Sequence, residues 1–179
     1  PAKITVRTNT QKCTPEELKD RLSQEGVTVE AIEGISYAFA LSGFDYLAGL
    51  GSFQDGWFYV QDISSMTVAH AADPKKGDYI IDVCAAPGGK SSHLAELLDG
   101  SGMVEARDLT EYKVGLIEEN ILRHDLHNMK AVQQDATLFD EASVEKADIL
   151  ICDLPCSGLG VIGRKSDIRY KMTAEKAHD

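Results

Sequence analysis

Basic residues are scarce in this chain of 179 residues, which has 18 Lys and Arg against 29 Asp and Glu and a net charge of −11. Because proteins contact phosphate backbones through clustered Lys and Arg, this balance argues against a general nucleic-acid binder. Long apolar runs are missing too: none approaches the roughly 20 residues that cross a bilayer, and no signal peptide opens the sequence. We therefore expect a cytoplasmic protein with no membrane partner.

Cysteines are also few, at four in the whole chain. That number is too small for a disulfide scaffold and is typical of free thiols in a reducing compartment. The closest pair, Cys152 and Cys156, has three intervening residues and no nearby His, which matches zinc-ligand spacing poorly. We expect no metal site. Cys152 lies in an apolar strand pattern and is interpreted as a buried structural thiol, and nothing assigns a role to Cys13.

The first 60 residues have the pattern of a small α+β unit. Thr14 and Pro15 form a strong helix start, and Glu17 completes a capping box. Leu18 and Leu22 then share one face of that helix. The other expected elements are strands at Lys3–Thr8, Val27–Ile32, Tyr37–Leu41 and Trp57–Val60, and a turn at Gly51–Gly56.

From residue 61 onward the pattern changes to alternating strands and helices, which is typical of a doubly wound parallel sheet. Tyr79–Cys84 is a continuous apolar run, as in a buried parallel strand. The other expected elements are helices at Gln61–Ala72, Lys90–Leu98 and Glu111–His124, the last with Val114, Ile117, Ile121 and Leu122 on its buried face, and strands at Met103–Ala106, Met129–Val132 and Ile149–Asp153. Only four strands fit this length, so we expect an incomplete sheet whose exposed edge allows an artificial dimer with a second copy.

The segment Asp82–Lys90 joins the first buried strand of this sheet to a helix. Its two glycines let the backbone approach a ligand, and the helix behind it offers N-terminal amides to an anionic group. The segment is neither a GxGxxG fingerprint nor a Walker A loop, which disfavours a dinucleotide or a nucleoside triphosphate. Asp108 follows Gly88 by 20 residues, where an acid takes a pair of ribose hydroxyls. The alternative is a tight structural turn and a surface acid; the combination favours a nucleoside ligand.

Four acidic residues are in or just after the four strands, at Asp82, Asp108, Asp135 and Asp153. The carboxyl ends of parallel strands are where open α/β sheets bind ligands, so we interpret these acids as ligand contacts. Cys156, in the segment Asp-Leu-Pro-Cys-Ser-Gly at 153–158, then lies at the mouth of the same cleft. A thiolate there can add to an electron-poor ring carbon, whereas the alternative is a buried structural cysteine.

These blocks resemble the RNA cytosine-5 methyltransferases of the Sun/Fmu family, and most closely the bacterial members that act on 16S ribosomal RNA. The resemblance lies in Cys-Ala-Ala-Pro-Gly-Gly-Lys at 84–90, in Asp108 and Asp135, and in residues 153–158; residues 58–66 and 162–170 match further blocks. It implies an α/β fold, a Rossmann-like class I S-adenosylmethionine-dependent methyltransferase domain over 61–179 with an incomplete parallel sheet. A small α+β RNA-recognition-like subdomain over 1–60 would precede it.

The resemblance also implies site residues. S-adenosylmethionine would be held by Cys84, Ala85, Ala86, Pro87, Gly88, Gly89, Lys90, Asp108, Asp135 and Asp153. Residues 84–90 would wrap its methionine part, Asp108 would hold the ribose hydroxyls, and Asp135 would contact the adenine. Asp153 would face the cofactor and the target cytosine. In this family the nucleophilic cysteine follows a Thr after the fifth strand, and the Pro-Cys thiol, here Cys156, assists product release.

Two departures from the family pattern point to a fragment. The chain has no Thr-Cys dipeptide and begins at Pro1 without the helical RNA-binding domain of the bacterial rRNA enzymes. We therefore expect it to be inactive alone. Ribosomal RNA (16S) is the expected partner, contacted by Arg164, Lys165 and Arg169 in a basic cluster beside the cleft, although such a cluster is often only a solvated loop.

Three alternatives stay open. The chain could be a naturally short or inactive module that binds S-adenosylmethionine without catalysis. Cys156 could itself attack the base, as the Pro-Cys thiol does in DNA cytosine-5 methyltransferases. A nicotinamide oxidoreductase is the weakest alternative, because the loop at 84–90 lacks the required glycine pattern.

Overall fold

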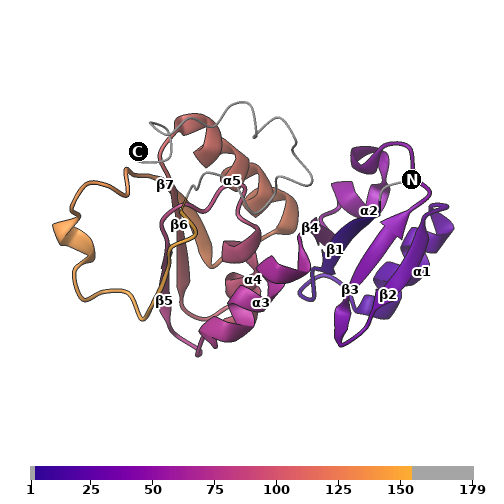
Figure 1. The fold of residues 1–179 in the computed structure, drawn as a ribbon, viewed down its shortest axis with the longest axis horizontal. Coiled ribbons are helices and arrows are strands. Elements are labelled where there is room, and N and C mark those ends of the chain that lie inside the picture. The colour runs from indigo at the N-terminus through magenta and orange to yellow at the C-terminus, as the bar shows by residue number, and fades with distance from the viewer. Residues whose placement is uncertain (1–2, 155–179) are drawn as a thin grey trace, which may run out of the picture.

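The computed structural model describes residues 3–154 and contains two four-stranded sheets, each with its own apolar core. Figure 1 shows the two sheets side by side, with the helices α3, α4 and α5 between them. Among the described residues no helix is both long and apolar enough to cross a membrane. A buried polar contact joins the first sheet to a helix that lies beside the second sheet.

The first sheet is antiparallel, with strand order β2-β3-β1-β4. Its elements are β1 (Ile4–Thr8), α1 (Pro15–Gln24), β2 (Thr28–Ile32), β3 (Ile35–Ser42) and β4 (Phe58–Val60). The capping box of α1 is confirmed: the Glu17 amide donates to the Thr14 hydroxyl, and the Thr14 amide to the Glu17 carboxylate. Leu18 and Leu22, which were predicted to share one face of α1, are both fully buried.

The predicted turn at Gly51–Gly56 is wrong for most of its length. The chain forms a 3-10 turn at Leu47–Gly49 (η1) and a short helix, α2, at Gly51–Gln54. The Glu25 carboxylate accepts hydrogen bonds from the Ser52 amide at 2.8 Å and the Ser52 hydroxyl at 2.5 Å. A carboxylate at a helix N-terminus stabilises the helix. This one comes from a distant part of the sequence, so no local pattern indicates it.

The second sheet is parallel, with strand order β7-β6-β5-β8, which confirms the predicted α/β fold. Its elements are α3 (Ile63–Ala72), β5 (Tyr79–Asp82), α4 (Gly89–Leu97), β6 (Met103–Asp108), α5 (Glu111–His124), β7 (Met129–Gln133), η2 (Glu141–Ser143) and β8 (Ile149–Ile151). In the described part of the chain β8 is an edge strand. The dimer expected through an exposed edge stays a prediction.

Two expected burials are wrong. Leu122, placed on the inner face of α5, is 80% exposed, whereas Ile117 on the same helix is fully buried. Leu122 follows Ile121 by one residue, so it lies about 100° further around the helix and leaves the core-facing stripe. Cys152 is exposed rather than buried, because β8 ends one residue earlier at Ile151.

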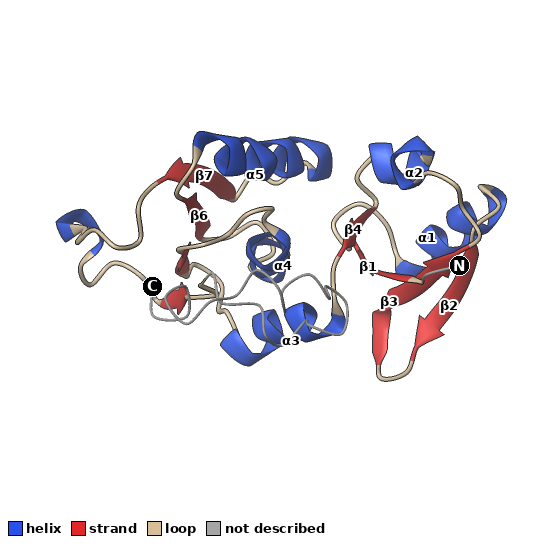
Figure 2. Ribbon diagram, turned by 45° about the horizontal axis from the view of Figure 1, so that its top comes forward, coloured by secondary structure: helices blue, strands red, loops and turns tan. Residues whose placement is uncertain are grey.

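Arg7 on β1 joins the first sheet to the helix α4. Its guanidinium is 1% exposed and donates to Gln61 Oε1 and Glu96 Oε1, each at 2.6 Å, and to Ser92 Oγ at 3.1 Å. The Tyr59 ring lies 4.1 Å from the guanidinium carbon. Figure 2 shows α4, which carries Ser92 and Glu96, in the space between the sheets. A buried charge needs such a set of partners to remain ionised.

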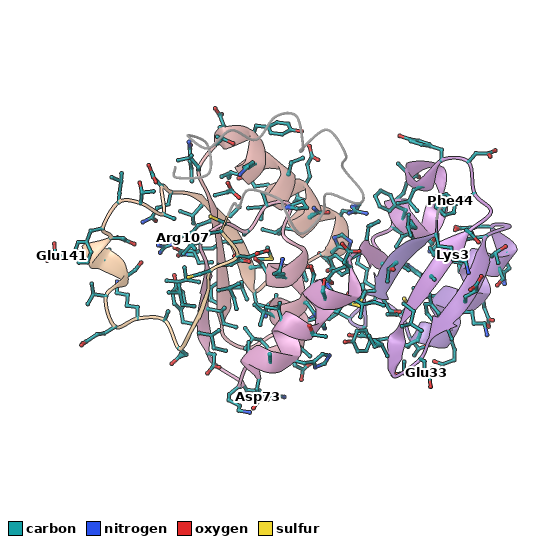
Figure 3. All side chains as sticks on the ribbon, in the orientation of Figure 1. Lys3, Glu33, Phe44, Asp73, Arg107 and Glu141 are labelled. Carbon is teal, nitrogen blue, oxygen red and sulfur yellow. The ribbon has the colours of Figure 1, made fainter. Side chains whose placement is uncertain are left out.

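Arg107 on β6 holds the connection between β7 and β8. It donates to Glu105 on its own strand at 2.5 Å, to Asp140 at 3.1 Å and to Ser143 at 2.6 Å. Figure 3 shows Arg107 on the side of the second sheet on which Glu141 and the η2 turn lie. Ionic and hydrogen-bonded contacts therefore fix a long connection next to the carboxyl ends of the strands.

His124 ends α5 and stacks on Tyr59, with ring centroids 3.6 Å apart. Its Nδ1 lies 2.8 Å from the Asn120 carbonyl oxygen, and its Nε2 lies 3.1 Å from that of Phe58. Burial, together with the positive charge of Arg123, lowers the pKa of His124 to about 4. The folded protein therefore holds a neutral imidazole that donates to one of the two carbonyls.

This pKa predicts a loss of stability in mild acid. The unfolded histidine has a pKa near 6.5, so below that pH the unfolded chain binds a proton that the folded chain does not. The contribution of His124 to the free energy of unfolding is fully present above about pH 6.5. It falls by up to about 1.4 kcal/mol per pH unit toward pH 4. Urea unfolding between pH 7.5 and 4.5 should show a shallower decline for His124→Gln than for the wild type. A wild-type stability that rises in acid relative to the variant would instead indicate an imidazolium.

Candidate functional site

The loop after β5 lies against both neighbouring strands. The Val83 amide donates to the Ile151 carbonyl on β8 at 3.1 Å, and the Ala85 amide to the Arg107 carbonyl on β6 at 2.8 Å. Gly88 ends the loop with a backbone φ of +102°, a conformation that residues with a side chain rarely adopt. Its amide donates to the Ala85 carbonyl. The loop thereby delivers the chain to the first turn of α4.

A pocket of about 210 Å³ opens beside this loop. Its lining comes from β4 and the start of α3 on one side and from β5, its loop and Asp153 on the other. The lining residues are Val60, Gln61, Asp62, Ser65, Asp82, Cys84, Ala85, Ala86, Pro87, Gly89, Lys90 and Asp153. The structure thus brings most of the predicted 84–90 set together with Asp153 around one cavity, whereas Gly88 lines a neighbouring one.

Lys90 and Asp153 form an ion pair at the pocket, with Lys90 Nζ 2.5 Å from Asp153 Oδ2. Lys90 is in the first turn of α4, and Asp153 follows β8, so the pair connects two segments that are 63 residues apart. The Asp153 side chain remains 61% exposed. It is therefore accessible to a ligand that enters the pocket.

Asp82, the last residue of β5, is 1% exposed and lines the same pocket. Its Oδ2 accepts a hydrogen bond from the Ser91 hydroxyl at 2.6 Å, while Oδ1 has no hydrogen-bond partner among the described residues. Burial raises the pKa of Asp82, against the opposing hydrogen bond of Ser91. A buried carboxylate oxygen without a partner is unfavourable, and a donor group of a ligand or a water molecule in the pocket would satisfy it.

Asp108 lies at the end of β6, on the side of β5 away from β8. It accepts hydrogen bonds from the backbone amides of Ala86 at 3.0 Å and Leu109 at 2.8 Å, and Lys113 Nζ lies 3.0 Å away. Burial favours the neutral acid, but Lys113 and the two amides prevail and hold the pKa of Asp108 below its usual range. Asp108 is thus an ionised acceptor that is held against the loop by the Ala86 amide.

Asp135 does not reach this pocket. It lies two residues beyond β7 and lines a second cavity of about 160 Å³ with Val83, Arg107, Gln134, Ala136, Leu138 and Asp140. The hydroxyl and the backbone amide of Thr137 donate to its carboxylate and lower the pKa of Asp135. The four acids at the strand ends therefore lie in three places along one edge of the sheet. Asp82 and Asp153 line the first cavity, Asp135 lines the second, and Asp108 is buried between strand and loop.

Cys84 is half-buried in the loop, and burial raises the pKa of its thiol, with the charge of Asp108 adding to the effect. A raised pKa disfavours the reactive thiolate, so Cys84 is a lining residue. Cys156, Arg164, Lys165 and Arg169 lie outside the described residues. Within residues 3–154 no group of three or more metal-ligating side chains is arranged to hold an ion.

Gln61 and Ser65 were not predicted as site residues, although both line the pocket. They lie in the block at 58–66, which the family resemblance includes without a role for these side chains. Gln61 directly follows β4, the one strand of the first sheet that leads into α3. The sequence signal for Gln61 is a glutamine between the end of a strand and the start of a helix. This signal becomes informative only with the hydrogen bond from Arg7, which fixes the orientation of the amide.

A sequence model of the family described as 16S rRNA methyltransferase RsmB/F matches residues 69–178, more than half of the chain. The chain belongs to this family. As a member of RsmB/F it is 43% identical over 171 residues to the probable ribosomal RNA small subunit methyltransferase B of Bacillus subtilis, a match that covers 95% of this chain and 38% of that protein. The chain thus spans about two fifths of the length of that curated relative.

Two further relatives agree with this membership. The tRNA (cytosine(72)-C(5))-methyltransferase of Pyrococcus horikoshii is 40% identical over 134 residues, covering 74% of this chain and 34% of that protein. The crystal structure of a methyltransferase homologue from the same organism is 31% identical with a TM-score of 0.79, covering 95% of this chain and 56% of that one. The RsmB/F chain therefore has the class I methyltransferase fold, and its family depends on S-adenosylmethionine.

The residues present fit that cofactor. Two buried polar atoms of the pocket, Asp82 Oδ1 and Gln61 Nε2, have no hydrogen-bond partner in the described part of the chain. The ionised Asp108 lies one strand away, next to the glycine-containing loop. An acceptor, a donor and a separate carboxylate are what a molecule with an amino-acid end and a ribose requires.

Proposed function

We propose that the protein containing this chain transfers a methyl group from S-adenosylmethionine to carbon 5 of a cytosine in 16S ribosomal RNA. The observation that carries this is the pocket that combines the 84–90 loop with the Lys90–Asp153 pair. Membership of the RsmB/F family supports it, as do the names of the relatives, one of which specifies a cytosine-5 reaction on tRNA.

Within this proposal, the loop residues 84–90 wrap the methionine part of the cofactor. Asp108, held ionised by Lys113 and two amides, accepts hydrogen bonds from the ribose hydroxyls. Asp135, beside the neighbouring cavity at the end of β7, contacts the adenine. The cofactor, when bound, supplies an electrophilic methyl group.

The base must leave its stack to reach such a pocket. A thiolate of the protein adds to carbon 6 of the cytosine, which makes carbon 5 nucleophilic enough to take the methyl group. A base then removes the carbon-5 proton, and the thiolate leaves with the electron pair of the carbon–sulfur bond. Asp153, exposed and paired with Lys90, faces the target cytosine.

We propose that the attacking cysteine lies in a Thr-Cys motif in a part of the protein beyond this chain, and that Cys156 assists release of the product. Residues 1–60 form an RNA-recognition subdomain beside the methyltransferase domain of residues 61–179. Arg164, Lys165 and Arg169 would contact the RNA phosphates, which would place the basic charge where it is needed despite the acidic balance of the whole chain.

The test uses the full-length protein with 16S RNA that contains 5-fluorocytosine, which cannot lose a proton from carbon 5. We expect a denaturation-resistant protein–RNA adduct that requires S-adenosylmethionine and still forms in Cys156→Ser. If the wild type forms the adduct and Cys156→Ser does not, the attack on the base would be assigned to Cys156. If the wild type binds the cofactor but neither methylates unmodified 16S RNA nor forms the adduct, the result would support an inactive binding module instead.

A further inference from the structure

We propose that a cavity at the junction of the two sheets, next to the pocket that contains Asp153, holds the base of a nucleotide that flanks the target cytosine. This inference rests on the proposed function, because it assumes an RNA substrate whose target base enters the first pocket. It goes beyond that function by assigning one flanking base to a defined place in the fold. Arg123 supplies the surface on which this base stacks.

The junction cavity has a volume of about 210 Å³ and is lined by both parts of the described chain. Leu47, Phe53 and Val60 line it from the first part. The loop residues 87–89 and Arg123, near the end of α5, line it from the second. The end of α5 meets α2 and β4 here (Figure 2). Pockets for drug-sized ligands measure roughly 300–1,000 Å³, so this cavity suits one flat group and not a whole nucleotide.

The junction cavity adjoins the first pocket directly. Val60, Pro87 and Gly89 line both of them. Val60 is 50% exposed, so an apolar side chain stands between the two openings. A target base that is unstacked into the first pocket remains joined to its neighbour by a single phosphodiester. The base of that neighbour therefore comes within reach of the junction cavity, on the other side of Val60.

Arg123 presents a flat surface to this cavity. Its guanidinium carbon lies 3.9 Å from the centre of the Phe53 ring, so the ring covers one face of the planar group. Two contacts at the edge of the guanidinium fix its plane, because Nη1 donates to the Phe53 carbonyl at 3.3 Å and Nη2 to Asn120 Oδ1 at 2.5 Å. The opposite face is the one that a flat ligand can cover. Unstacked bases of RNA stack on guanidinium planes of this kind.

Charge also favours a nucleotide over other flat ligands. Among the described residues that line the junction cavity there is no Asp or Glu, although the whole chain has a net charge of −11. Arg123 brings a positive charge, and the exposed Lys12 places its Nζ 3.0 Å from the Arg123 carbonyl oxygen. Phosphates on both sides of a stacked base would meet these cations. Because the remaining lining is mostly apolar, we expect stacking with little preference among the four bases.

The test uses the full-length protein and short RNAs that lack one base. Bisulfite sequencing of 16S RNA treated with the protein and S-adenosylmethionine first locates the methylated cytosine. Oligoribonucleotides around it are then made with an abasic unit on one or the other side of the target, which keeps the phosphates and removes only the base. We expect one of the two abasic RNAs to bind the wild type about tenfold more weakly than the intact RNA.

Arg123→Leu should remove this response. It keeps an apolar side chain but lacks the guanidinium plane, so it should bind the intact RNA about as weakly as the wild type binds the abasic one. Its own loss with the abasic RNA should stay within twofold, because both changes remove the same contact. S-adenosylhomocysteine, measured by calorimetry, should bind Arg123→Leu within twofold of the wild type. This second readout identifies a variant whose fold or cofactor pocket is damaged.

Arg21→Leu is the matched control. Arg21 also stacks on an aromatic ring, 4.3 Å from the centre of Trp57, but it lines neither the first pocket nor the junction cavity. The control loses the same charge and the same kind of stacking, and it should keep the tenfold response to the abasic unit. If Arg123→Leu does not fold, Leu47→Ala, which removes an apolar contact with the base and keeps the guanidinium, should reduce the response.

Two results would overturn the subsite. One is an abasic response of equal size in Arg123→Leu and the wild type. The other is a wild type that methylates the intact RNA and responds to neither abasic unit, as expected if another segment of the protein fills the cavity. A wild type that methylates no cytosine at all would instead refute the proposed function, and the subsite with it.

Discussion

Replacing Arg7 with Ala should lower the free energy of unfolding by about 3–5 kcal/mol. The substitution removes the positive charge and leaves the Glu96 carboxylate, 3% exposed, without its ionic partner. It also removes the donors to Gln61 and Ser92 and the cation over the Tyr59 ring. Uncompensated burial of a charge is among the few single changes that can cost this much.

Urea unfolding measures this effect, and Lys3→Ala provides the control. Lys3 pairs with Glu30 at 2.7 Å, but both side chains are about half exposed, so its loss should cost at most about 1 kcal/mol. A double-mutant cycle of Arg7→Ala with Glu96→Gln should show strong coupling, because the neutral amide no longer needs the cation. An Arg7→Ala protein as stable as Lys3→Ala would mean that the two sheets are not held together by this contact.

Much of the fold could be predicted from the sequence, because the relevant interactions are local. The capping box joins Thr14 to Glu17 within one turn, and the apolar run at Tyr79–Asp82 needs no distant partner to be recognised as a buried strand. The strand-end acids could also be located, because the carboxyl ends of parallel strands share one edge of a sheet. Asp82 and Asp108 indeed end β5 and β6.

The rest depends on contacts between distant segments. Arg7 contacts Ser92 and Glu96, which lie 85 and 89 residues away in the sequence. No hydrophobic periodicity in the first strand shows that its arginine is buried. Gln61 becomes a candidate site residue only once Arg7 fixes its amide. The helix α2 depends on Glu25 in the same way. Leu122 and Cys152 failed for a simpler reason: each lies one residue beyond the position that the pattern supports.

Gly56→Ala should destabilise the protein by about 3 kcal/mol or more, where the turn before β4 meets the end of α5. Gly56 has φ +68°, which costs a side-chain-bearing residue about 1–2 kcal/mol. In addition, the new Cβ would lie 2.0 Å from the Arg123 carbonyl oxygen near the end of α5, so backbone has to move. Thermal and urea unfolding should both show the loss.

Gly100→Ala separates the two contributions. Gly100 has a similar φ of +73°, but a Cβ there meets nothing within 4 Å, so only the conformational cost of about 1–2 kcal/mol applies. Both substitutions restrict the unfolded chain equally, and that effect cancels in the comparison. Equal losses in the two variants would show that α5 yields without cost. A larger loss for Gly56→Ala would show that α5 resists displacement. Asn120 of this helix donates to the Pro87 carbonyl of the loop after β5 at 2.8 Å. The same displacement should then weaken S-adenosylhomocysteine binding, whereas Gly100→Ala should not.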